Sequence, residues 1–411
     1  MCLLQFREQP MKKYLYGTTA LAAAGLLAGP AFAATPLHME LGGFFQQFFG
    51  YANPDKASNG ATNPNKAGNY KNAEVYFKMR GELDNGLKVG GRLELEGDNG
   101  GDQIDQAFLT LSGGFGQLRL GAINSGRYSY GWNTDAPSVG VPINSGWVSS
   151  FVPALNNSGF RFRSPGLSTV IDASNDEEKI TYFTPRVNGF QFALSWTPEA
   201  HKVTSNSVGQ GGESFRFTGP ADRNLFFTNA ADLGVSYSAE FQGVGIEAQA
   251  GIGVADAPNV VDQGTTQASF NDKYLAYNGG LSLSYQGFTA AGSFAVVDQG
   301  LAFNCALGGG GLASSGACTA SNEGESYNFG VGYNTGPWAV SATYFNGQEE
   351  GLIANPGDEE NEFFTVAASY TLGPGLRTAL TFLHADLSDD LPTSAGDNTG
   401  DAVIWGVFAS F

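Results

Sequence analysis

Residues 74–96 read EVYFKMRGELDNGLKVGGRLELE, two segments of alternating character on either side of a turn signal. In the first, apolar side chains occupy odd positions and charged ones even positions: Val75, Phe77 and Met79 against Glu74, Lys78, Arg80 and Glu82. After Asp84-Asn85-Gly86 the alternation resumes with Leu87, Val89, Leu93 and Leu95 against Lys88, Arg92, Glu94 and Glu96. Because successive side chains of a β-strand point to opposite faces, the stretch predicts a hairpin with one apolar and one charged face.

The same two-residue alternation recurs along the chain, for example in residues 190–196 and 244–252. Seven short turn signals punctuate it: Asp84-Asn85-Gly86, Gly113-Gly114-Phe115-Gly116, Val187-Asn188-Gly189, Phe241-Gln242-Gly243, Gln286-Gly287, Asn334-Thr335-Gly336-Pro337 and Gly373-Pro374-Gly375. Eight longer polar stretches cover residues 52–71, 97–102, 124–178, 198–229, 256–273, 298–325, 347–361 and 386–400. Seven turns and eight loops join sixteen strands. The sequence therefore predicts an all-β fold, a sixteen-stranded antiparallel transmembrane barrel with short periplasmic turns and long extracellular loops.

Aromatic residues and the end of the chain agree with a membrane barrel. Six of the seven turns have an aromatic residue within three positions, as an interfacial girdle requires. The last strand alternates up to an aromatic carboxy-terminal residue, Phe411. Since only a closed barrel leaves no unpaired edge in lipid, this strand is expected to pair with the first, residues 39–51. A secreted soluble β-solenoid or adhesin is the alternative.

The amino-terminal residues read as an export signal. Lys12 and Lys13 precede an apolar stretch at residues 14–28, which ends in Ala31-Phe32-Ala33, an A-x-A cleavage site. Residues 1–33 are therefore predicted to be a signal peptide, and residues 34–411 the barrel domain. Residues 1–10 precede a second Met and are interpreted as a start-site overcall. A short transmembrane helix is the alternative for the apolar stretch.

Composition excludes several classes of function. The formal charge of -18 argues against nucleic acid as a partner, because phosphate binding needs clustered Lys and Arg. Three Cys and three His leave little room for a zinc or haem scaffold, and no cofactor is expected. The chain has no G-x-S-x-G, G-x-G-x-x-G or H-E-x-x-H motif, and its His residues lie far apart in sequence. No catalytic residue is predicted, and an enzyme is not expected.

Several short motifs, taken in their order, resemble the general diffusion porins of Gram-negative outer membranes. They are the signal peptide, residues 179–185 (KITYFTP) with the turn and strand start that follow, and the terminal Phe411, which the resemblance makes a membrane-insertion signal. The resemblance implies a homotrimer of sixteen-stranded barrels in outer-membrane lipid, each passing small hydrophilic solutes. It also implies that the third long loop folds into the barrel and forms a constriction, with acidic loop residues facing a basic wall.

Local residues fit that implication. Inward-facing basic side chains at similar depth on nearby predicted strands form a candidate wall: Lys78, Arg80, Arg92 and Arg119. The loop 124–178 carries the candidate constriction residues Asp135, Asp172, Asp176, Glu177 and Glu178, together with Arg161 and Arg163. Opposed rows of charge in a narrow lumen would orient dipolar solutes and filter ions by sign. The alternative is that Lys78 and Arg80 pair with Glu82 and Glu94 on the wall.

Aromatic residues of the same loop suggest a second kind of channel. Sugar-transporting porins line their path with rings, and the loop contains Tyr128, Tyr130, Trp132 and Trp147. The favoured interpretation is that these rings pack the loop against the inner wall. A solute-selective channel stays an alternative, as does a structural or adhesive barrel whose lumen is plugged.

Other loop features give weaker predictions. Cys305 and Cys318 lie in one exposed loop and are expected to form a disulfide in an oxidising compartment; two free thiols are the alternative. Acidic loop stretches, including residues 358–360 and Asp386, Asp389 and Asp390, are candidates for collecting divalent cations at the surface. The acidic balance of the chain predicts a mild cation preference.

Overall fold

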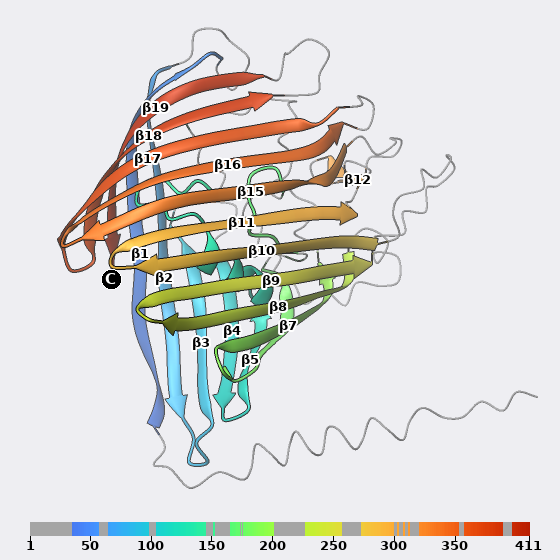
Figure 1. Cartoon of the computed structure of the whole chain (residues 1–411). Coiled ribbons are helices and arrows are strands. Elements are labelled where there is room, and N and C mark those ends of the chain that lie inside the picture. The colour runs from blue at the N-terminus through green and yellow to red at the C-terminus, as the bar shows by residue number, and fades with distance from the viewer. Residues whose placement is uncertain are drawn as a thin grey trace, which may run out of the picture.

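The computed structural model describes residues 35–56, 65–97, 104–144, 151–152, 165–172, 174, 176–200, 227–256, 273–299, 302–303, 307–308, 311–312, 320–352, 357–388 and 397–411. In these residues, sixteen long strands form one closed antiparallel barrel (Figure 1), which confirms the predicted fold. The predicted signal peptide lies outside the described residues. None of the helices in the described part has the length and hydropathy to span a membrane.

The barrel strands follow one another around the ring. They are β1 (Thr35–Pro54), β2 (Ala67–Glu82), β3 (Lys88–Glu96), β4 (Ile104–Gly113), β5 (Gly116–Ala122), β6 (Glu178–Phe183), β7 (Phe190–Ala200), β8 (Phe227–Phe241), β9 (Val244–Asp256), β10 (Lys273–Tyr285), β11 (Phe288–Gln299), β15 (Ala320–Thr335), β16 (Trp338–Leu352), β17 (Glu359–Gly373), β18 (Leu376–Ser388) and β19 (Asn398–Ser410). Short strands lie between β11 and β15: β12 (Ala302–Phe303) pairs with β15, and β13 (Leu307–Gly308) with β14 (Gly311–Leu312). The segment between β5 and β6 contains helix α2 (Gly126–Gly131) and the 3-10 helix η2 (Trp132–Thr134).

The first and last strands close the ring, as the sequence predicted. β1 pairs antiparallel with β2 on one side and with β19 on the other, from Phe44 opposite Ser410 to Pro54 opposite Gly400. Figure 1 shows blue β1 reaching red β19 at this seam. Apart from the first part of β1, which pairs with β2 alone, the strands are paired on both sides, so their backbone polar groups are satisfied within the sheet.

Several strands are longer than predicted. β15 begins at Ala320 and β16 ends at Leu352, inside stretches that the sequence assigned to loops. Glu325 of β15 stands opposite Gln348 of β16 in the register. These two residues share the outer face, and Ser326 and Glu349 are buried on the inner face, so polar residues occupy both faces at this end of the strands. Period-2 alternation cannot mark a strand where neither face is apolar, which explains the difference in bounds.

The turns use backbone conformations that favour Gly. In three of them both central residues have positive φ, for example Asn188 at 49° and Gly189 at 86°. Such pairs match the right-handed twist of the flanking strands and keep a hairpin loop to two residues. The predicted turns between these strands are confirmed.

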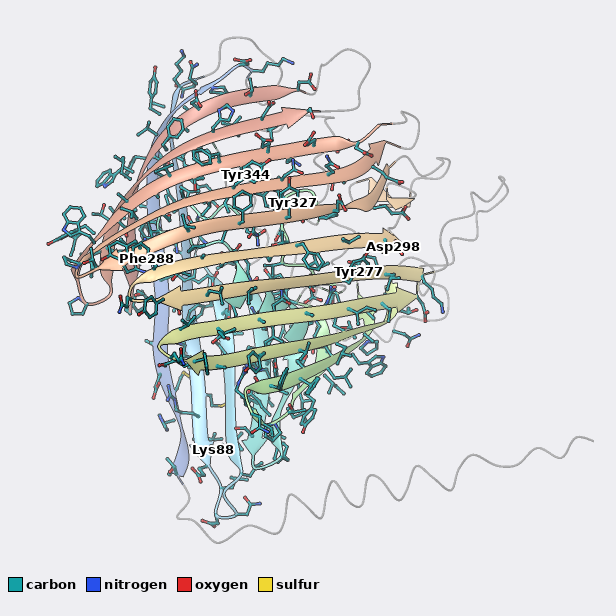
Figure 2. The ribbon with its side chains drawn as sticks, viewed as in Figure 1. Lys88, Tyr277, Phe288, Asp298, Tyr327 and Tyr344 are labelled. Atoms are coloured by element: carbon teal, nitrogen blue, oxygen red, sulfur yellow. The ribbon has the colours of Figure 1, made fainter. Side chains whose placement is uncertain are left out.

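Aromatic side chains gather on the outside of the barrel near the turns. Phe190 packs on Tyr237, Phe288 on Tyr333 and Trp338 on Tyr370, with ring centroids 4.6, 4.3 and 4.6 Å apart. Phe288 lies at the turn end of the barrel, exposed on the outer surface (Figure 2). Amphipathic and apolar rings at this level form the predicted girdle.

The inner face of the barrel is not polar all round. On β16 to β19 and β1 it carries large apolar side chains, which form a buried cluster with residues of the segment between β5 and β6. The wall contributes Phe48, Phe345, Phe363, Leu383, Leu387, Ile404 and Phe408, and the segment contributes Val141, Ile143, Phe151 and Val152. The hydrophobic core of this protein thus lies inside the barrel, on one side of the lumen.

Candidate functional site

The third long loop enters the barrel and runs along its inner wall. Helix α2 lies against β6 to β10, and η2 lies against β9 to β11. Further along, the amide of Val139 donates to Ser341 Oγ of β16 at 3.1 Å, and that of Val141 to Thr381 Oγ1 of β18 at 3.2 Å. The described anchors of the loop follow the wall from β6 round to β1. This is the inward-folded third loop that the sequence analysis expected.

A buried ion pair fixes the start of the loop. Arg127 of α2 is fully buried, and its Nε donates to Asp232 Oδ1 of β8 at 2.7 Å. Gly251 and Gly253 of β9 leave space for this side chain, because a Cβ at either position would stand within 2.5 Å of an Arg127 side-chain atom. A charge enclosed in this way is tolerable only beside its partner. The two glycines thus leave a notch in the sheet that the Arg127 side chain fills.

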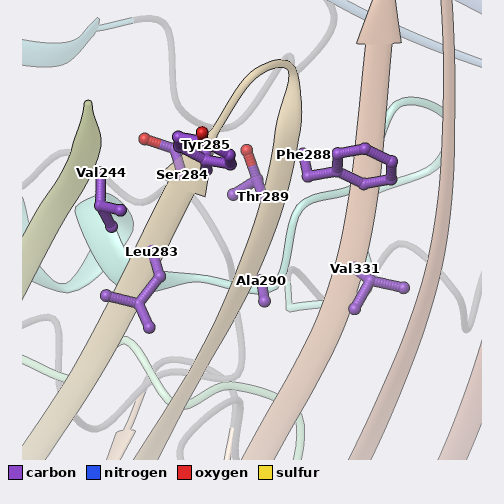
Figure 3. A pocket seen from close by; sticks show the side chains of 8 residues that line it. All are labelled: Val244, Leu283, Ser284, Tyr285, Phe288, Thr289, Ala290 and Val331. Carbon is purple, nitrogen blue, oxygen red and sulfur yellow. The ribbon is translucent and has the colours of Figure 1, made fainter. Parts of the chain in front are cut away.

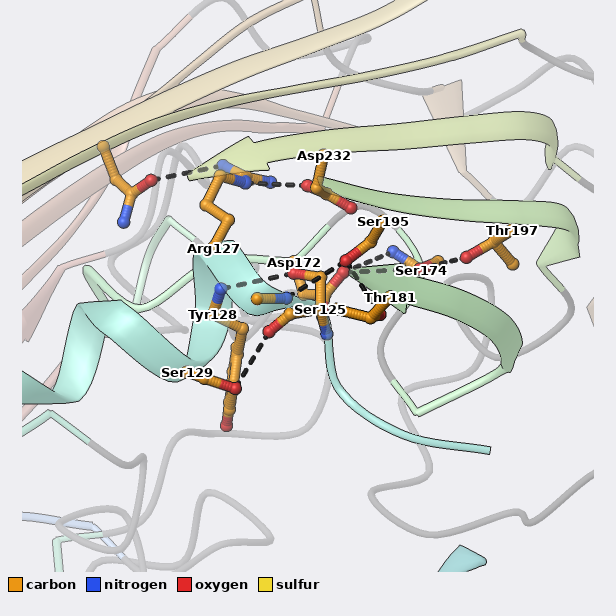
Figure 4. A network of polar contacts seen from close by, with 12 residues as sticks. Ser125, Arg127, Tyr128, Ser129, Asp172, Ser174, Thr181, Ser195, Thr197 and Asp232 are labelled. Carbon is orange, nitrogen blue, oxygen red and sulfur yellow. Dashed lines mark hydrogen bonds and ion pairs between the residues drawn. The ribbon is translucent and has the colours of Figure 1, made fainter. Parts of the chain in front are cut away.

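Hydroxyl and carboxylate groups hold the neighbouring turn (Figure 4). Ser125 caps α2, since its Oγ accepts from the amide of Tyr128 at 3.2 Å, while its own amide donates to Asp172 Oδ2 at 2.6 Å. The amide of Gly126 donates to Ser195 Oγ of β7 at 3.1 Å. Asp172 thereby joins the outgoing and returning parts of the loop.

The remaining acidic loop residues also lie among neighbours. Asp135 accepts from the amide of Ala136 at 2.8 Å and from Asn328 Nδ2 of β15 at 3.0 Å. Desolvation raises the pKa of its carboxyl to about 7, although these hydrogen bonds favour the charged form. Asp176 and Glu177 are buried, and Glu178 is exposed at the start of β6. Their predicted role in the constriction stays a prediction.

The residues predicted to form a basic wall lie on the inner face of β2, β3 and β5, and their role in a constriction stays a prediction. Lys78 and Arg92 are cross-strand neighbours, and Arg119 lies on the same face two strands further on. Arg92 pairs with the buried Glu94. Arg80 is exposed and pairs with Glu40 of β1, a partner that the sequence analysis missed. The wall thus contains ion pairs as well as cations that have no carboxylate partner among the described residues.

Rings and cations alternate along this wall. The Arg92 guanidinium lies 4.7 Å from the Tyr76 ring centroid and 6.0 Å from that of Phe108. The Arg119 guanidinium lies 5.7 Å from Phe108 and 4.6 Å from Phe183. Tyr76, Arg92, Phe108, Arg119 and Phe183 stand on β2, β3, β4, β5 and β6 in turn. We call these five residues the ring-arginine row; its contacts have the geometry of cation–π interactions.

The loop aromatics mostly pack. Tyr130 is buried against Phe183, with ring centroids 5.9 Å apart, as the favoured interpretation expected. Tyr128 contacts Trp132 edge-on at 5.9 Å, and Trp132 stays 38% exposed. Trp147 lies outside the described residues. One loop ring therefore anchors the loop, and another is open to solvent.

Several residues with clear roles were missed from sequence. Arg127 and Asp232, and the rings of Tyr76 and Phe108, were not singled out. The sequence signal that could have identified the missed strand residues was an acidic or aromatic residue at an inward-facing position of a strand whose outward-facing positions are apolar. Four residues of the sequence analysis lie outside the described residues, so their predicted roles stay predictions: Arg161, Arg163, Cys305 and Cys318.

Two other features of the described residues offer little polar chemistry. An apolar groove lies beside the β10–β11 turn (Figure 3), lined by Val244, Leu283, Ser284, Tyr285, Phe288, Thr289, Ala290 and Val331. Its lining fits lipid contact better than a polar solute. Within the described ranges, no three His, Cys, Asp or Glu side chains gather so as to hold a metal ion.

Comparisons with known proteins agree with this geometry. The family model described as Gram-negative porin matches residues 17–390. The major outer membrane protein P.IB of Neisseria gonorrhoeae is 26% identical over 165 residues, 39% of this chain and 40% of that relative's length. The anion-selective porin from Comamonas acidovorans is 14% identical and superposes with a TM-score of 0.57 over 92% of this chain and 100% of its own.

The structure of OmpF of Salmonella typhi in complex with daunomycin gives a TM-score of 0.57 at 14% identity, covering 91% of this chain and 97% of that one. At these identities the structural likeness shows the fold. The family match adds the cellular location, the outer membrane, and a family of channel proteins rather than enzymes. By its sequence over residues 17–390 and by its closed sixteen-stranded barrel, this chain belongs to the Gram-negative porin family.

Proposed function

We propose that this porin is a passive channel through which small hydrophilic solutes and ions diffuse down their gradients. The observation that carries the proposal is the one-sided position of the loop. Its described anchors lie on β6 to β11, β15 to β19 and β1, whereas β2 to β5 present charged side chains on their inner face. A lumen whose wall is covered by the loop except along β2 to β5, where charged side chains face inward, supports a water-filled path along those strands.

Single-channel conductance of the purified protein in a planar bilayer tests the proposal. Stepwise openings in potassium chloride are expected, commonly in threes if the channel is trimeric. The same detergent without protein is the control. Absence of any step from protein shown to be folded by its heat-dependent mobility in gels would contradict the diffusion channel and favour a plugged barrel.

We also propose a mild cation preference. Basic and acidic side chains share the charged wall, for example Arg92 beside Glu94, so the wall imposes no strong sign of its own. The formal charge of -18 then supports enrichment of cations near the mouths. The reversal potential across a salt gradient measures this preference, and a value favouring anions would contradict it.

A solute-selective channel is the second candidate. The exposed ring of Trp132, held edge-on against Tyr128, is the observation that favours it. A sugar that stacks on this ring would interrupt the ion current. Current interruptions by a sugar in the natural protein that disappear in Trp132→Ala would support this candidate.

We propose that three copies associate in the membrane. Pairing of β1 with β19 starts at Phe44, whereas pairing with β2 starts at Thr35, so the first part of β1 has one edge without a strand partner among the described residues. Leu37, Met39 and Leu41 on this part are 57%, 67% and 66% exposed. An open strand edge with exposed apolar side chains is a surface that a second copy can cover. Chemical cross-linking in native membranes tests this.

The channel is proposed to work without a cofactor. Surface divalent cations at the acidic loops stay a separate proposal, which atomic absorption on protein dialysed against chelator would test. Bound calcium that survives dialysis, and whose removal lowers thermal stability, is the outcome that supports such sites.

A further inference from the structure

The apolar groove beside the β10–β11 turn runs along the outer face of β11. Its floor is Ala290, which stands opposite Leu283 of β10 on one side and Val331 of β15 on the other. Both larger residues are exposed, and Figure 3 shows the short Ala290 side chain between them. The next outward position of β11 is Gly292, which has no side chain. Two consecutive outward positions of one strand therefore lie lower than the residues on its two neighbours.

Gly292 continues the groove with the same cross-section. It stands opposite Leu281 of β10 and Phe329 of β15, which are also exposed. A Cβ at this position would lie 2.7 Å from the carbonyl oxygen of Asn328, so a larger residue would require the strands to shift. The backbones of β10 and β15 are about 10 Å apart, because two strand spacings separate them. Side chains on both walls narrow this width to that of a single hydrocarbon chain.

Aromatic rings mark both ends of the groove. At the turn end, Phe288 packs on Tyr333 with ring centroids 4.3 Å apart and stands opposite Tyr285 in the register. At the other end, Phe294 is the outward residue that follows Gly292. The strand between the two phenylalanines is about 20 Å long. With a strand tilt of about 45°, this length gives a height of about 14 Å, close to half of the ~30 Å hydrocarbon core. The groove therefore spans one leaflet of the membrane, the leaflet on the periplasmic side.

The position and the chemistry of the groove identify its occupant. The groove is continuous with the outer face of the barrel, which contacts lipid. Its floor and walls are apolar, while Tyr285 and Tyr333 stand at the turn end, and such amphipathic rings favour the headgroup level. An unfilled groove would forfeit dispersion contacts, and small residues let a partner approach the backbone closely. A second barrel would rest on the walls and leave the floor empty, whereas a flexible acyl chain can reach it.

We propose that this groove binds one acyl chain of a phospholipid from the periplasmic leaflet. The headgroup lies beside Tyr285 and Tyr333, and the chain runs over Ala290 and Gly292 towards Phe294. The site is on the outside of the barrel, so it is independent of the path of solutes through the lumen. The strands β15 to β19 separate it from β1, so the groove stays open to lipid when another copy covers the first part of β1.

Native mass spectrometry of the purified protein, titrated with phosphatidylethanolamine in detergent micelles, tests the site. The natural protein is expected to hold one phospholipid per subunit more tightly than any further one. Ala290→Leu fills the floor, so the dissociation constant of this first phospholipid should rise about tenfold. Ala368→Leu on the outer face of β17 is the matched control, because Ala368 is exposed and lies between Tyr370 and Val366, a gap of a single position. The control should leave the dissociation constant unchanged.

Heat-dependent mobility in gels shows whether each variant is folded. Equal binding by the natural protein and Ala290→Leu would overturn the site, and so would an equal loss in Ala368→Leu, since the lipid would then have no preferred position. Cryo-electron microscopy of the natural protein in phospholipid nanodiscs tests the site without any variant. Continuous density from Tyr285 to Phe294 would support the proposal. An empty groove, or one filled by a neighbouring barrel or by a chain from the opposite leaflet, would overturn it.

Discussion

The inner walls at β2 to β5 and at β16 to β19 with β1 belong to one sheet, yet they differ in chemistry. The first presents Lys78, Arg92 and Arg119, interleaved with rings. The second presents residues such as Phe345 and Leu383, covered by the loop. On their outer faces both are apolar, as lipid requires.

The difference shows what each inner face contributes. The apolar wall gives the loop a hydrophobic surface to bury, and this burial offsets the entropy lost on ordering a long segment. The charged wall offers the loop no such surface. The same alternating pattern therefore builds both the apolar wall that anchors the loop and the charged wall beside it.

The largest loss of stability is expected when Asp232, the acid that neutralises Arg127 of the loop, is removed. Asp232→Leu leaves Arg127 charged, buried and unpaired, which is expected to cost about 3–5 kcal/mol of unfolding free energy. Urea unfolding in detergent micelles measures it. The double variant Arg127→Met with Asp232→Leu should recover much of the loss, since it removes both charges. A single variant as stable as the natural protein would show that the pair does not hold the loop.

A smaller loss of unfolding free energy is expected from a cavity between the loop and the apolar wall. Ile143 is 0% exposed against the apolar wall, and Ile143→Ala should cost about 2–5 kcal/mol and make the channel current noisier. Ile252→Ala, at a lipid-facing position that is 43% exposed, removes the same atoms and is the control. Equal losses in the two variants would mean that the loop contributes no packing.

The protonation of Asp135 gives a further test of how the wall holds the loop, because the carboxyl of this loop residue lies against β15. Its folded pKa of about 7 is above the usual 3.8, so the folded state holds this proton more tightly than the unfolded chain does. The unfolding free energy should therefore fall as pH rises from about 4 to about 7 and level off beyond. Asp135→Asn should lose this part of the pH dependence. An unchanged pH profile in the variant would contradict the raised pKa.

The smallest effect is expected at the rim of the charged wall. Arg80→Gln removes an exposed ion pair with Glu40, worth about 0–1 kcal/mol and less at high salt. Unfolding curves at low and high ionic strength measure this. A loss well above that range would mean that the rim of this wall is structurally more important than its exposure indicates.

The barrel could be predicted from sequence because lipid enforces a simple rule on its outer face. Period-2 alternation, turn residues and the terminal strand gave the strand number, the seam and the girdle. The alternation also placed Lys78, Arg92 and Arg119 on one face of neighbouring strands, as in the register, while their role as a constriction wall stays a prediction. The inner partners were not predictable in the same way. Arg127 meets Asp232 across about a hundred positions of sequence, and only the folded ring brings them together.

The inward-facing aromatic residues were not predicted from the sequence, for a related reason. Tyr76 and Phe108 look like further apolar residues in strands that already contain many, and their role depends on a cation on the next strand. The roles predicted for the acidic loop residues depended on the path of the loop. No alternation describes that path, which follows from the apolar patch of β16 to β19 and from the glycine notch in β9.

The seam between β1 and β19 has a consequence for how the chain folds. It joins Phe44 to Ser410, residues almost as far apart in sequence as the barrel allows. Hairpins between neighbouring strands can form early, but the ring cannot close until the last strand has been made. Until then both terminal strands present open edges that invite pairing with other chains. Export and assembly of this protein therefore require that the nascent sheet be shielded until its final thirteen residues, β19, are in place.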